Sequence, residues 1–566
     1  MNDLGNRLPE QAVYYNINNN LGRELEVIYQ ILAKLLLVSA CLSAAVLTHA
    51  AETKPAPGEE RAFAAMKAGI DIPAPAPARP VGEGEGPFDL LVIKDVVLID
   101  GAGAPPRGPV TITIEGNRIA SIKNEPPEEI ADGNTHVIDG KGMYAMPGLV
   151  DAHAHAGNPM QGLAGPVVPP EYVFKLWMGH GITTVRDVGA VMGLDWTVSH
   201  KERSAANEIT APRIFVHSMF PGGEVVDEKG AREWTATVIR RGADGVKLRG
   251  ATEAASRAVI DETKRLDKTT SNHHDQVGVY KVNVLTSARW GLDSMEHWYG
   301  LPEALFEDKT IQDYPPDYNY ADEQWRFGQA GRLWKQAAAP GSDKWQAVLN
   351  ELVTLDFTLV PTFTIYEANR DVVRARDREW HADYTLPALG KFFMPNPELH
   401  GSYHFDWTTT DEVEWGRNFH LWMQFINDYK NAGGRVATGS DAGFIFKVYG
   451  FALIRELELL QEAGFHPLEV VQAATLNGAE LIGVDAEIGS VVPGKKADII
   501  LIDENPVQNF KVLYGTGHMR LNRDSGELER VGGVRFTIKD GIVWDARALL
   551  ADVREMVREA KTSKTD

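Results

Sequence analysis

The sequence predicts an α/β protein, in which a closed (β/α)8 barrel carries a small β domain formed by the two flanks of the chain. Two observations support this fold class. Short apolar strands alternate with helical stretches through the middle of the chain, and β-rich segments with a period of two lie on both sides of that region. A length of 566 residues also favours more than one domain.

The central region contains eight predicted strands, which is the number that closes a (β/α)8 barrel. They cover residues 149–153, 182–185, 213–216, 246–248, 269–273, 292–297, 358–361 and 436–441. A doubly wound open sheet would alternate in the same way. No Gly-x-Gly-x-x-Gly sequence follows a strand, however, so the pattern favours the barrel.

The flanking β-rich segments are too few on either side to close a sheet by themselves, so we expect the two ends to pair. They lie at 90–99, 110–122 and 136–139 before the barrel, and at 497–502 and 534–544 after it. The predicted domains are an N-terminal arm with a signal peptide (1–50), a Pro/Gly-rich linker (51–87), the N-terminal segment of a β-sandwich (88–145), the barrel (146–485), the C-terminal segment of the β-sandwich (486–545) and a C-terminal helix (546–566).

The N-terminal arm predicts export to the periplasm or the outside of the cell. Lys34 precedes an apolar run at 35–47, and small residues before and at Ala50 form a cleavage site. The run is too short for a stable membrane span. Residues 38–41 also resemble a lipoprotein box with Cys41 lipidated, an alternative that we rank second because few residues separate Lys34 from Cys41.

Charge and cysteine content exclude two properties. The formal net charge of −21 argues against a nucleic-acid partner, since binding to nucleic acid requires a basic surface. The single cysteine excludes an intrachain disulfide.

Metal-ligand residue types recur at the carboxyl ends of the predicted strands, where barrel enzymes place their chemistry. His153 and His155 are two residues apart and would face the same way on a strand. Lys247 lies within an otherwise apolar strand, where an unpaired cation is costly. His273 and His274, His297 and Asp441 follow at later strand ends. Packing alone does not explain such a set.

These pieces closely resemble the amidohydrolase superfamily, and within it the imidazolonepropionase-like and Xaa-Pro dipeptidase-like branch. The matching stretches are MPGLVDAHAH (146–155), GITTVRDVG (181–189), ADGVK (243–247), GLDSMEH (291–297), TGSDAG (438–443), AATLNGAE (473–480) and IGSVVPGKKADIILI (488–502). The resemblance runs from about residue 88 to residue 545 and implies a distorted (β/α)8 barrel with a β-sandwich domain built from both flanks.

The resemblance also implies two divalent metal ions, with Zn²⁺ as the expected metal, bridged by a CO₂-derived carbamate on Lys247. His153 and His155 would hold one ion with Asp441, and the histidines of the fifth and sixth strands would hold the other. Two such cations activate a water molecule and polarise a carbonyl group. Asp441 would then act as general base and acid.

Which histidine completes the second site stays open between two neighbours. Lys268 to His273 gives the better strand register, so we select His273, whereas His274 would point to the opposite face unless a bulge exchanged them. Tyr299, Tyr366 and Arg249 lie just past strand ends and are weaker candidates for binding a substrate carboxylate or oxyanion.

The predicted function is therefore that of an exported binuclear hydrolase acting on an amide bond of a small molecule or dipeptide. The activity would resemble that of an Xaa-Pro or N-acyl amino acid dipeptidase, or of a cyclic-amide hydrolase. Two alternatives remain: a mononuclear deaminase in which Lys247 is not a ligand, and a catalytically silent relative that only binds. A homo-oligomer is compatible with the sequence, which does not fix the number of subunits.

Overall fold

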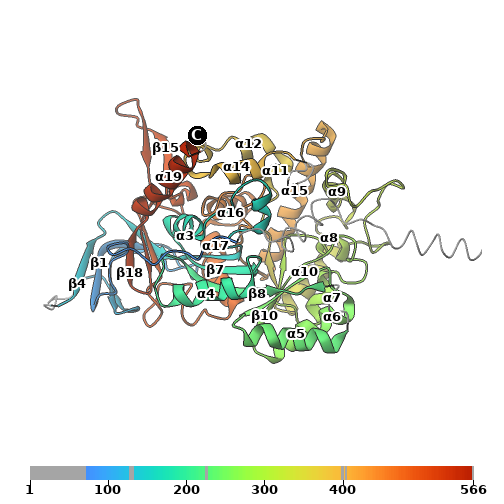
Figure 1. Ribbon diagram of the computed structural model, residues 1–566, viewed down its shortest axis with the longest axis horizontal. Helices are drawn as coiled ribbons and strands as arrows, with labels where there is room; N and C mark the ends of the chain where they lie inside the picture. The colour runs from blue at the N-terminus through green and yellow to red at the C-terminus, as the bar shows by residue number, and fades with distance from the viewer. Residues whose placement is uncertain are drawn as a thin grey trace, which may run out of the picture.

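The structure is a computed structural model that describes residues 72–125, 133–222, 227–396, 399, 401 and 404–563. The N-terminal arm, the signal peptide with Cys41 and most of the linker lie outside these residues. The described chain forms a sheet of eight parallel strands, a second sheet of eight strands and a two-stranded hairpin. As Figure 1 shows, strands from the two ends of the chain lie together at one side of the molecule.

The parallel sheet contains the eight predicted barrel strands in sequence order. They are β6 (Leu149–Ala154), β7 (Ile182–Gly189), β8 (Arg213–Met219), β9 (Gly245–Arg249), β10 (Thr269–His273), β11 (Ser294–Glu296), β12 (Thr358–Val360) and β13 (Arg435–Val436). Every residue of β6 and β7 is buried. Burial on both faces is typical of a parallel sheet that helices cover.

Backbone hydrogen bonds join the two edges of this curled sheet. The amide of Ala152 in β6 donates to the carbonyl of Thr438 at 2.9 Å, and the amide of Ser440 donates to the carbonyl of His153 at 3.1 Å. The eighth strand, β13, is only 2 residues long. The residues that follow it nevertheless pair with the first strand, β6. This pairing brings Asp441 beside His153 of β6 and beside His155, which directly follows that strand.

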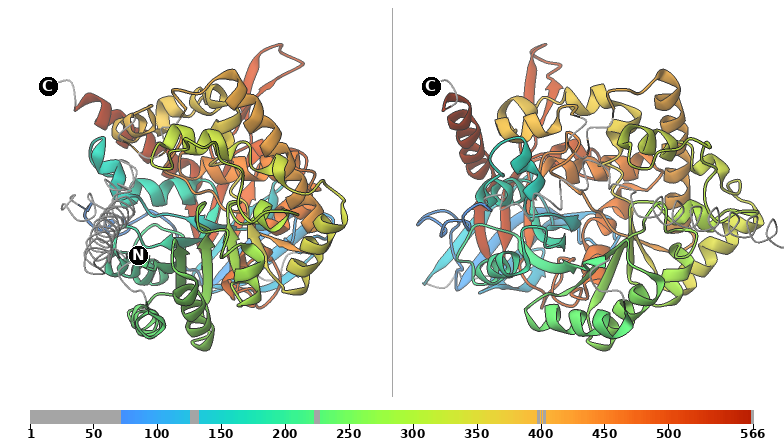
Figure 2. Two further views of the ribbon diagram at one scale, coloured as in Figure 1. Left: turned by 90° about the vertical axis from the view of Figure 1, so that its right-hand side faces the viewer. Right: turned by 45° about the vertical axis from the view of Figure 1, so that its right-hand side comes forward.

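Helices follow the strands and surround the sheet, as Figures 1 and 2 show. Caps fix several of their ends; for example, the Thr252 hydroxyl accepts from the amide of Ala255 at the start of α6. The helices of the barrel region are α3 (Pro170–Gly179), α4 (Leu194–Ala205), α5 (Glu228–Arg240), α6 (Glu253–Arg265), α7 (Val284–Arg289), α10 (Asp343–Thr354), α15 (Thr409–Asn431), α16 (Phe451–Glu462), α17 (Pro467–Ala473) and α18 (Leu476–Ile482).

The second sheet is built from both flanks, as predicted. Its order is β18-β17-β14-β5-β1-β2-β3, with β4 also paired to β1. The strands are β1 (Leu90–Leu98), β2 (Arg107–Glu115), β3 (Arg118–Lys123), β4 (Thr135–Asp139), β5 (Tyr144–Pro147), β14 (Ile499–Ile502), β17 (Val534–Lys539) and β18 (Ile542–Asp545). Because hydrogen bonds connect these strands into one sheet, the expected sandwich of two sheets is not confirmed.

Contact between the flanks fixes where the barrel begins. β14 pairs antiparallel with β5, with Leu501 opposite Ala145, and β6 follows β5 after a single residue, Gly148. The C-terminal helix α19 (Ala546–Thr562) packs against α3. The hairpin of β15 (His518–Leu521) and β16 (Leu528–Val531) forms a separate two-stranded sheet that projects from the molecule in Figure 2.

The long connections after β11 and β12 contain short helices and dock on each other. The first contains α8 (Leu301–Ala304) and α9 (Glu323–Ala330), and the second contains α11 (Glu367–Arg370), α12 (Val372–Arg376), α13 (His381–Tyr384) and α14 (Pro387–Phe393) before α15. The indole Nε1 of Trp415 donates to the carbonyl of Phe327 at 2.8 Å, and that of Trp407 to Gln324 at 3.0 Å. Many of their aromatic side chains therefore pack in this joint subdomain.

Among the described helices, none has the length and apolar character needed to cross a membrane.

Candidate active site

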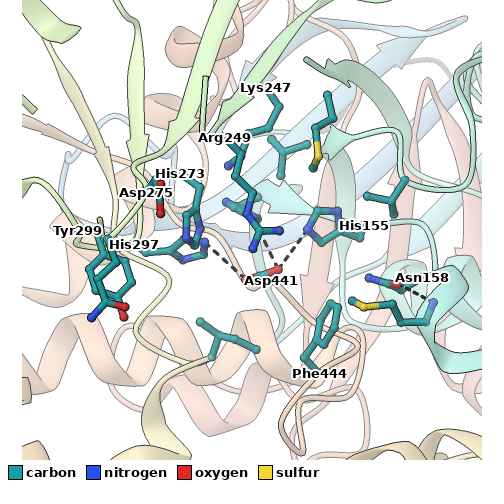
Figure 3. A pocket seen from close by; sticks show the side chains of 18 of the residues that line it. His155, Asn158, Lys247, Arg249, His273, Asp275, His297, Tyr299, Asp441 and Phe444 are labelled. Atoms are coloured by element: carbon teal, nitrogen blue, oxygen red, sulfur yellow. Dashed lines mark hydrogen bonds and ion pairs between the residues drawn. The ribbon is translucent and has the colours of Figure 1, made fainter. Parts of the chain in front are cut away.

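A pocket of about 500 Å³ lies at the carboxyl ends of the barrel strands. Its lining includes every residue that the sequence analysis selected for a ligand or substrate role, with the exception of His274. Figure 3 shows His155 and His297 on opposite sides of Asp441, with Lys247 and Arg249 above it. The predicted strand ends thus converge on one cavity.

Asp441 lies at the centre of the histidines. Its Oδ1 atom is 3.1 Å from His155 Nε2 and 3.6 Å from His153 Nε2, and its Oδ2 atom is 3.7 Å from His297 Nε2. One ligand atom from each of His153, His155 and Asp441 lies within 4.8 Å of the other two. Two imidazoles and a carboxylate at this spacing are a suitable donor set for a divalent cation such as Zn²⁺.

The buried carboxylate of Asp151 and the unusual backbone conformation of Asp441 direct the Asp441 side chain towards these histidines. Asp441 has a φ of 47°, in the left-handed region that residues other than glycine rarely adopt. The neighbouring Ser440 donates from its amide to Asp151 Oδ1 at 2.9 Å and from its hydroxyl to Asp151 Oδ2 at 2.5 Å. Asp151 therefore clamps the end of the eighth strand onto the first.

His273 and His297 form the other side of the cluster. Their ring centroids are 4.8 Å apart, and both rings line the pocket. His297 also has a left-handed backbone, with a φ of 64°, and its Nδ1 atom is 2.6 Å from the Thr362 hydroxyl. His274 is buried outside the pocket lining, and its Nε2 atom hydrogen-bonds the Ser287 hydroxyl at 2.8 Å. The structure thus brings His273, not His274, to the cluster.

Burial keeps three of the four histidines of the cluster neutral. It lowers the pKa of His153 to about 4 and that of His297 to about 3, and it holds the pKa of His273 well below its usual range. Burial would also lower the pKa of His155, but its hydrogen bond to Asp441 and the charges of Asp441 and Asp187 raise this pKa above its usual value. Burial alone would raise the pKa of Asp441, but the surrounding histidines hold it well below its usual range. Neutral imidazoles around an ionised carboxylate are the protonation states that metal binding requires.

Lys247 reaches the same pocket from β9 as a buried amine. Its Nζ atom has no hydrogen-bond partner among the described residues, and burial lowers its pKa to about 8. A lysine with a lowered pKa has a larger neutral fraction, which is the form that reacts with CO₂. The orphaned position of Nζ fits a carbamate, because a carbamate would replace the isolated amine by oxygen atoms.

The predicted substrate contacts line the pocket beside this cluster. Tyr299 and Tyr366 are buried, and the ring of Tyr366 lies 5.6 Å from that of His297. Arg249 is exposed at the end of β9. The structure adds Arg326 from α9, which is only 4% exposed and was not selected from the sequence. Its position in a long connection, far from any strand end, offered no motif by which to find it.

A second set that sequence reasoning missed lies behind His153. The carboxylate of Glu296 hydrogen-bonds His153 Nδ1, and its other oxygen accepts from Arg186 Nη2 at 2.9 Å and from Ser294 Oγ at 2.8 Å. All these groups are buried. Both residues lie in motifs quoted above: Glu296 directly precedes His297, and Arg186 lies within residues 181–189. The sequence does not reveal their contacts, because the partners in the His153–Glu296 and Arg186–Glu296 pairs are more than 100 positions apart.

The parallel strands bring histidines and carboxylates together at their carboxyl ends, which is where barrel enzymes place their chemistry. The amidohydrolase family model matches residues 423–543. Adenine deaminase from Staphylothermus marinus is 32% identical over 179 residues, which cover 30% of this chain and 27% of that protein. Imidazolonepropionase from Geobacillus sp. (strain WCH70) is 35% identical over 106 residues, covering 18% and 25%. The matches therefore span about a quarter of these curated relatives.

Similarity of fold extends over most of the chain. A solved structure of an Xaa-Pro dipeptidase with bound methionine superposes with a TM-score of 0.53 at 17% sequence identity, covering 81% of this chain and all of that one. The comparisons confirm the resemblance to the amidohydrolase superfamily and, in fold, to its Xaa-Pro dipeptidase-like members.

Proposed function

We propose that the protein is an exported binuclear metal-dependent hydrolase that cleaves an amide bond of a small substrate. The observation that carries this proposal is Lys247, a buried amine that has no hydrogen-bond partner in the described part of the chain. It belongs to the lining of a pocket that also contains four histidines and Asp441. An isolated buried amine is costly unless it is modified or paired.

The candidate metal ligands form two groups, each of which would hold one metal ion. His153, His155 and Asp441 would hold one, His273 and His297 would hold the other, and a carbamate on Lys247 would contribute an oxygen to each. Two bound cations supply a water molecule of lowered pKa and a Lewis acid for the substrate carbonyl. We assign Zn²⁺ as the metal because the donors are mainly imidazole nitrogens.

The chain's own groups perform the proton transfer and hold the substrate. Asp441 is an ionised carboxylate whose Oδ2 atom faces the pocket side of His297, so it can accept a proton and return it to the leaving nitrogen. Tyr366 and Arg249 line the adjacent wall and would orient the carbonyl or a nearby anionic group. Asp151 and Glu296 fix the positions of Asp441 and His153 through the contacts described above.

A K247A variant tests the binuclear proposal. Wild-type protein loaded with Zn²⁺ in bicarbonate should bind about two metal ions per chain and hydrolyse amides, and K247A should bind one and lose most of this activity. K201A is a matched control, because Lys201 pairs with Asp244 outside the pocket lining. One metal per chain in active wild-type protein, together with an active K247A variant, would overturn the proposal.

A deaminase is the second candidate, because the most extensive curated match named above is an adenine deaminase. Release of ammonia from adenine by the wild-type protein, without hydrolysis of any dipeptide, acyl amino acid or lactam, would favour it. A catalytically silent relative would still bind metal, but it would release no ammonia from adenine and hydrolyse none of these amides.

A further inference from the structure

The turn that follows β12 has a backbone conformation that its own residues disfavour. Thr362 lies two residues past the end of β12, is fully buried and has a φ of 50°. A β-branched residue is an outlier in this left-handed region, where glycine would fit without strain. Such a conformation persists only where the surrounding structure imposes it, and strain of this kind gathers at functional sites. The contacts of Thr362 show what the threonine does there.

The hydroxyl of Thr362 lies between a backbone carbonyl and the ring of His297. It donates to the carbonyl of Pro361 at 2.6 Å, and its oxygen is also 2.6 Å from His297 Nδ1. Because the hydroxyl has one hydrogen and gives it to the carbonyl, its lone pairs are left to accept the Nδ1–H of His297. A neutral imidazole that carries its proton on Nδ1 has an unprotonated Nε2. The Thr362 hydroxyl therefore selects the form of His297 that can bind a metal ion.

Glu456 of α16 holds the turn from the other side. Its side chain is fully buried, and its two oxygens accept from the amide of Phe363 at 2.9 Å and from the amide of Thr364 at 2.7 Å. Within the described part of the chain, no lysine or arginine hydrogen-bonds this carboxylate. A buried charge is costly unless such donors compensate it. In return, the carboxylate fixes the backbone directly after Thr362.

We propose that Thr362 and Glu456 are positioning residues for His297. Glu456 holds the two amides, the fixed turn keeps the Thr362 hydroxyl at Nδ1, and the hydroxyl leaves Nε2 for a metal ion. Neither side chain lines the pocket, so direct contact with a substrate does not account for them. The assignment rests on the proposed function in one respect, namely that His297 is a metal ligand.

Variants of Thr362 test the role of its hydroxyl. T362V keeps the branched shape and loses the hydroxyl, whereas T362S keeps the hydroxyl. T364V is the matched control, because Thr364 is fully buried in the same turn and its hydroxyl has no hydrogen-bond partner in the described chain. In competition with a chromogenic zinc chelator, T362V should bind the ion at His297 about 10–100-fold more weakly, and T362S and T364V should stay close to wild type. Equal zinc affinity in T362V and T364V would overturn the assignment.

An E456Q variant tests the second positioning residue. Glutamine has one acceptor oxygen, so its NH₂ group must face one of the two amide donors. E458Q is the matched control on the same helix, because Glu458 accepts from Arg455 at 2.8 Å and from the Tyr514 hydroxyl at 3.1 Å. Burial raises the pKa of Glu456 to about 8, so the variants are compared at about pH 9, where the carboxylate is ionised.

We expect E456Q to lower zinc affinity about tenfold and E458Q to leave it unchanged. The T362V/E456Q double variant should lose little more than T362V alone, because both changes act on one histidine. Unchanged affinity in E456Q would remove Glu456 from the proposal. Losses that add in full would show that Glu456 does not act through Thr362.

Metal binding separates this inference from the proposed function. A wild type that binds zinc but hydrolyses no amide would overturn the hydrolase, while weaker binding in T362V would still support the positioning role. A wild type that binds one ion per chain would overturn the binuclear site, and T362V then shows whether His297 holds that ion. Unchanged affinity in T362V overturns the inference even if amide hydrolysis is observed, and a wild type that binds no zinc overturns both proposals.

Discussion

Glu296 and Glu367 are both fully buried glutamates that arginine binds, and they differ in what else they contact. Glu296 is bound by Arg186 and Ser294 and turns its second oxygen to His153 of the candidate metal site. Glu367 accepts from Lys447 Nζ at 2.7 Å and from Arg455 Nε at 2.9 Å. The first carboxylate faces a candidate metal ligand. The second faces cations that belong to the scaffold, and Arg378 Nη2 also donates to it at 3.3 Å.

The difference assigns the two clusters to separate tasks. Lys447 follows Phe444 and Ile445, which line the pocket, so Glu367 ties this loop to α11 and α16. The loop needs such an anchor because Ile445 has a φ of 46°, a strained value for a β-branched residue. Glu296 instead fixes one ring: a carboxylate on Nδ1 holds the proton there and leaves Nε2 free to bind a metal.

Removal of Glu367 should have the largest effect on folding. E367A leaves Lys447 and Arg455 buried without their shared carboxylate, and breaking a buried pair in this way costs about 3–5 kcal/mol. We expect the free energy of unfolding, measured by urea denaturation, to fall by that amount. Glu462 provides the control, because it also pairs with an arginine at 2.7 Å but is 43% exposed, so E462A should cost under about 1 kcal/mol.

The pH dependence of unfolding tests the same pair. Burial alone would raise the pKa of Glu367, but Lys447 and Arg455 hold it well below its usual range. A carboxylate with a lowered pKa in the folded state stabilises the protein above its unfolded pKa of about 4.3 and loses this contribution as the pH falls. The gap between wild type and E367A should therefore narrow below about pH 4. A gap independent of pH would show that packing, and not charge, stabilises this region.

Removal of the Glu296 charge should act on metal binding more than on folding. E296Q keeps the shape of the side chain but no longer offers His153 an anionic acceptor, and loss of such a partner typically lowers metal affinity about 10–100-fold. Competition with a chromogenic zinc chelator measures this affinity without any enzyme assay. E303Q is the control, since Glu303 is buried and caps the amide of Gly300 without contacting a ligand. Equal zinc affinity in E296Q and wild type would contradict the assignment of Glu296 to metal binding.

The sequence predicts the candidate metal ligands better than it predicts the buried residues that hold them in place, and the reason is physical. Ligands such as His153, His155 and Asp441 stand at ends of apolar strands, and barrel topology brings all strand ends together, so their convergence followed from local patterns. The pairing of the two β flanks followed in the same way. Arg186, Glu296 and Glu367 acquire their roles through charged or ring partners at least 80 positions away, and no periodicity encodes such a contact. Arg326 depends on how two long connections dock.

The adjacent histidines show how far local reasoning reaches. Strand register favoured His273, and the structure places its ring in the pocket lining. The ring of His274 instead hydrogen-bonds the Ser287 hydroxyl of α7. Register could rank the two because successive residues of a strand face opposite ways. It could not supply the left-handed backbone of His297 or Asp441, since tertiary contacts impose a conformation that the residues themselves disfavour.

Replacement of Arg186 should give the smallest effect and shows whether Glu296 needs its arginine. Arg186 donates to Ala152 O at 2.6 Å, to Ser294 Oγ at 3.1 Å and to Glu296 at 2.9 Å. R186K keeps the charge but cannot reach all three acceptors, which should cost about 1 kcal/mol per lost hydrogen bond. Because Glu296 stays ionised, zinc affinity should fall less than in E296Q, by under about tenfold. R213K, which alters an arginine bound to Asp498 and Asp540 away from the pocket, should lower stability without changing zinc affinity. A larger loss of zinc affinity in R186K than in E296Q would mean that Arg186, and not Glu296, controls the orientation of His153.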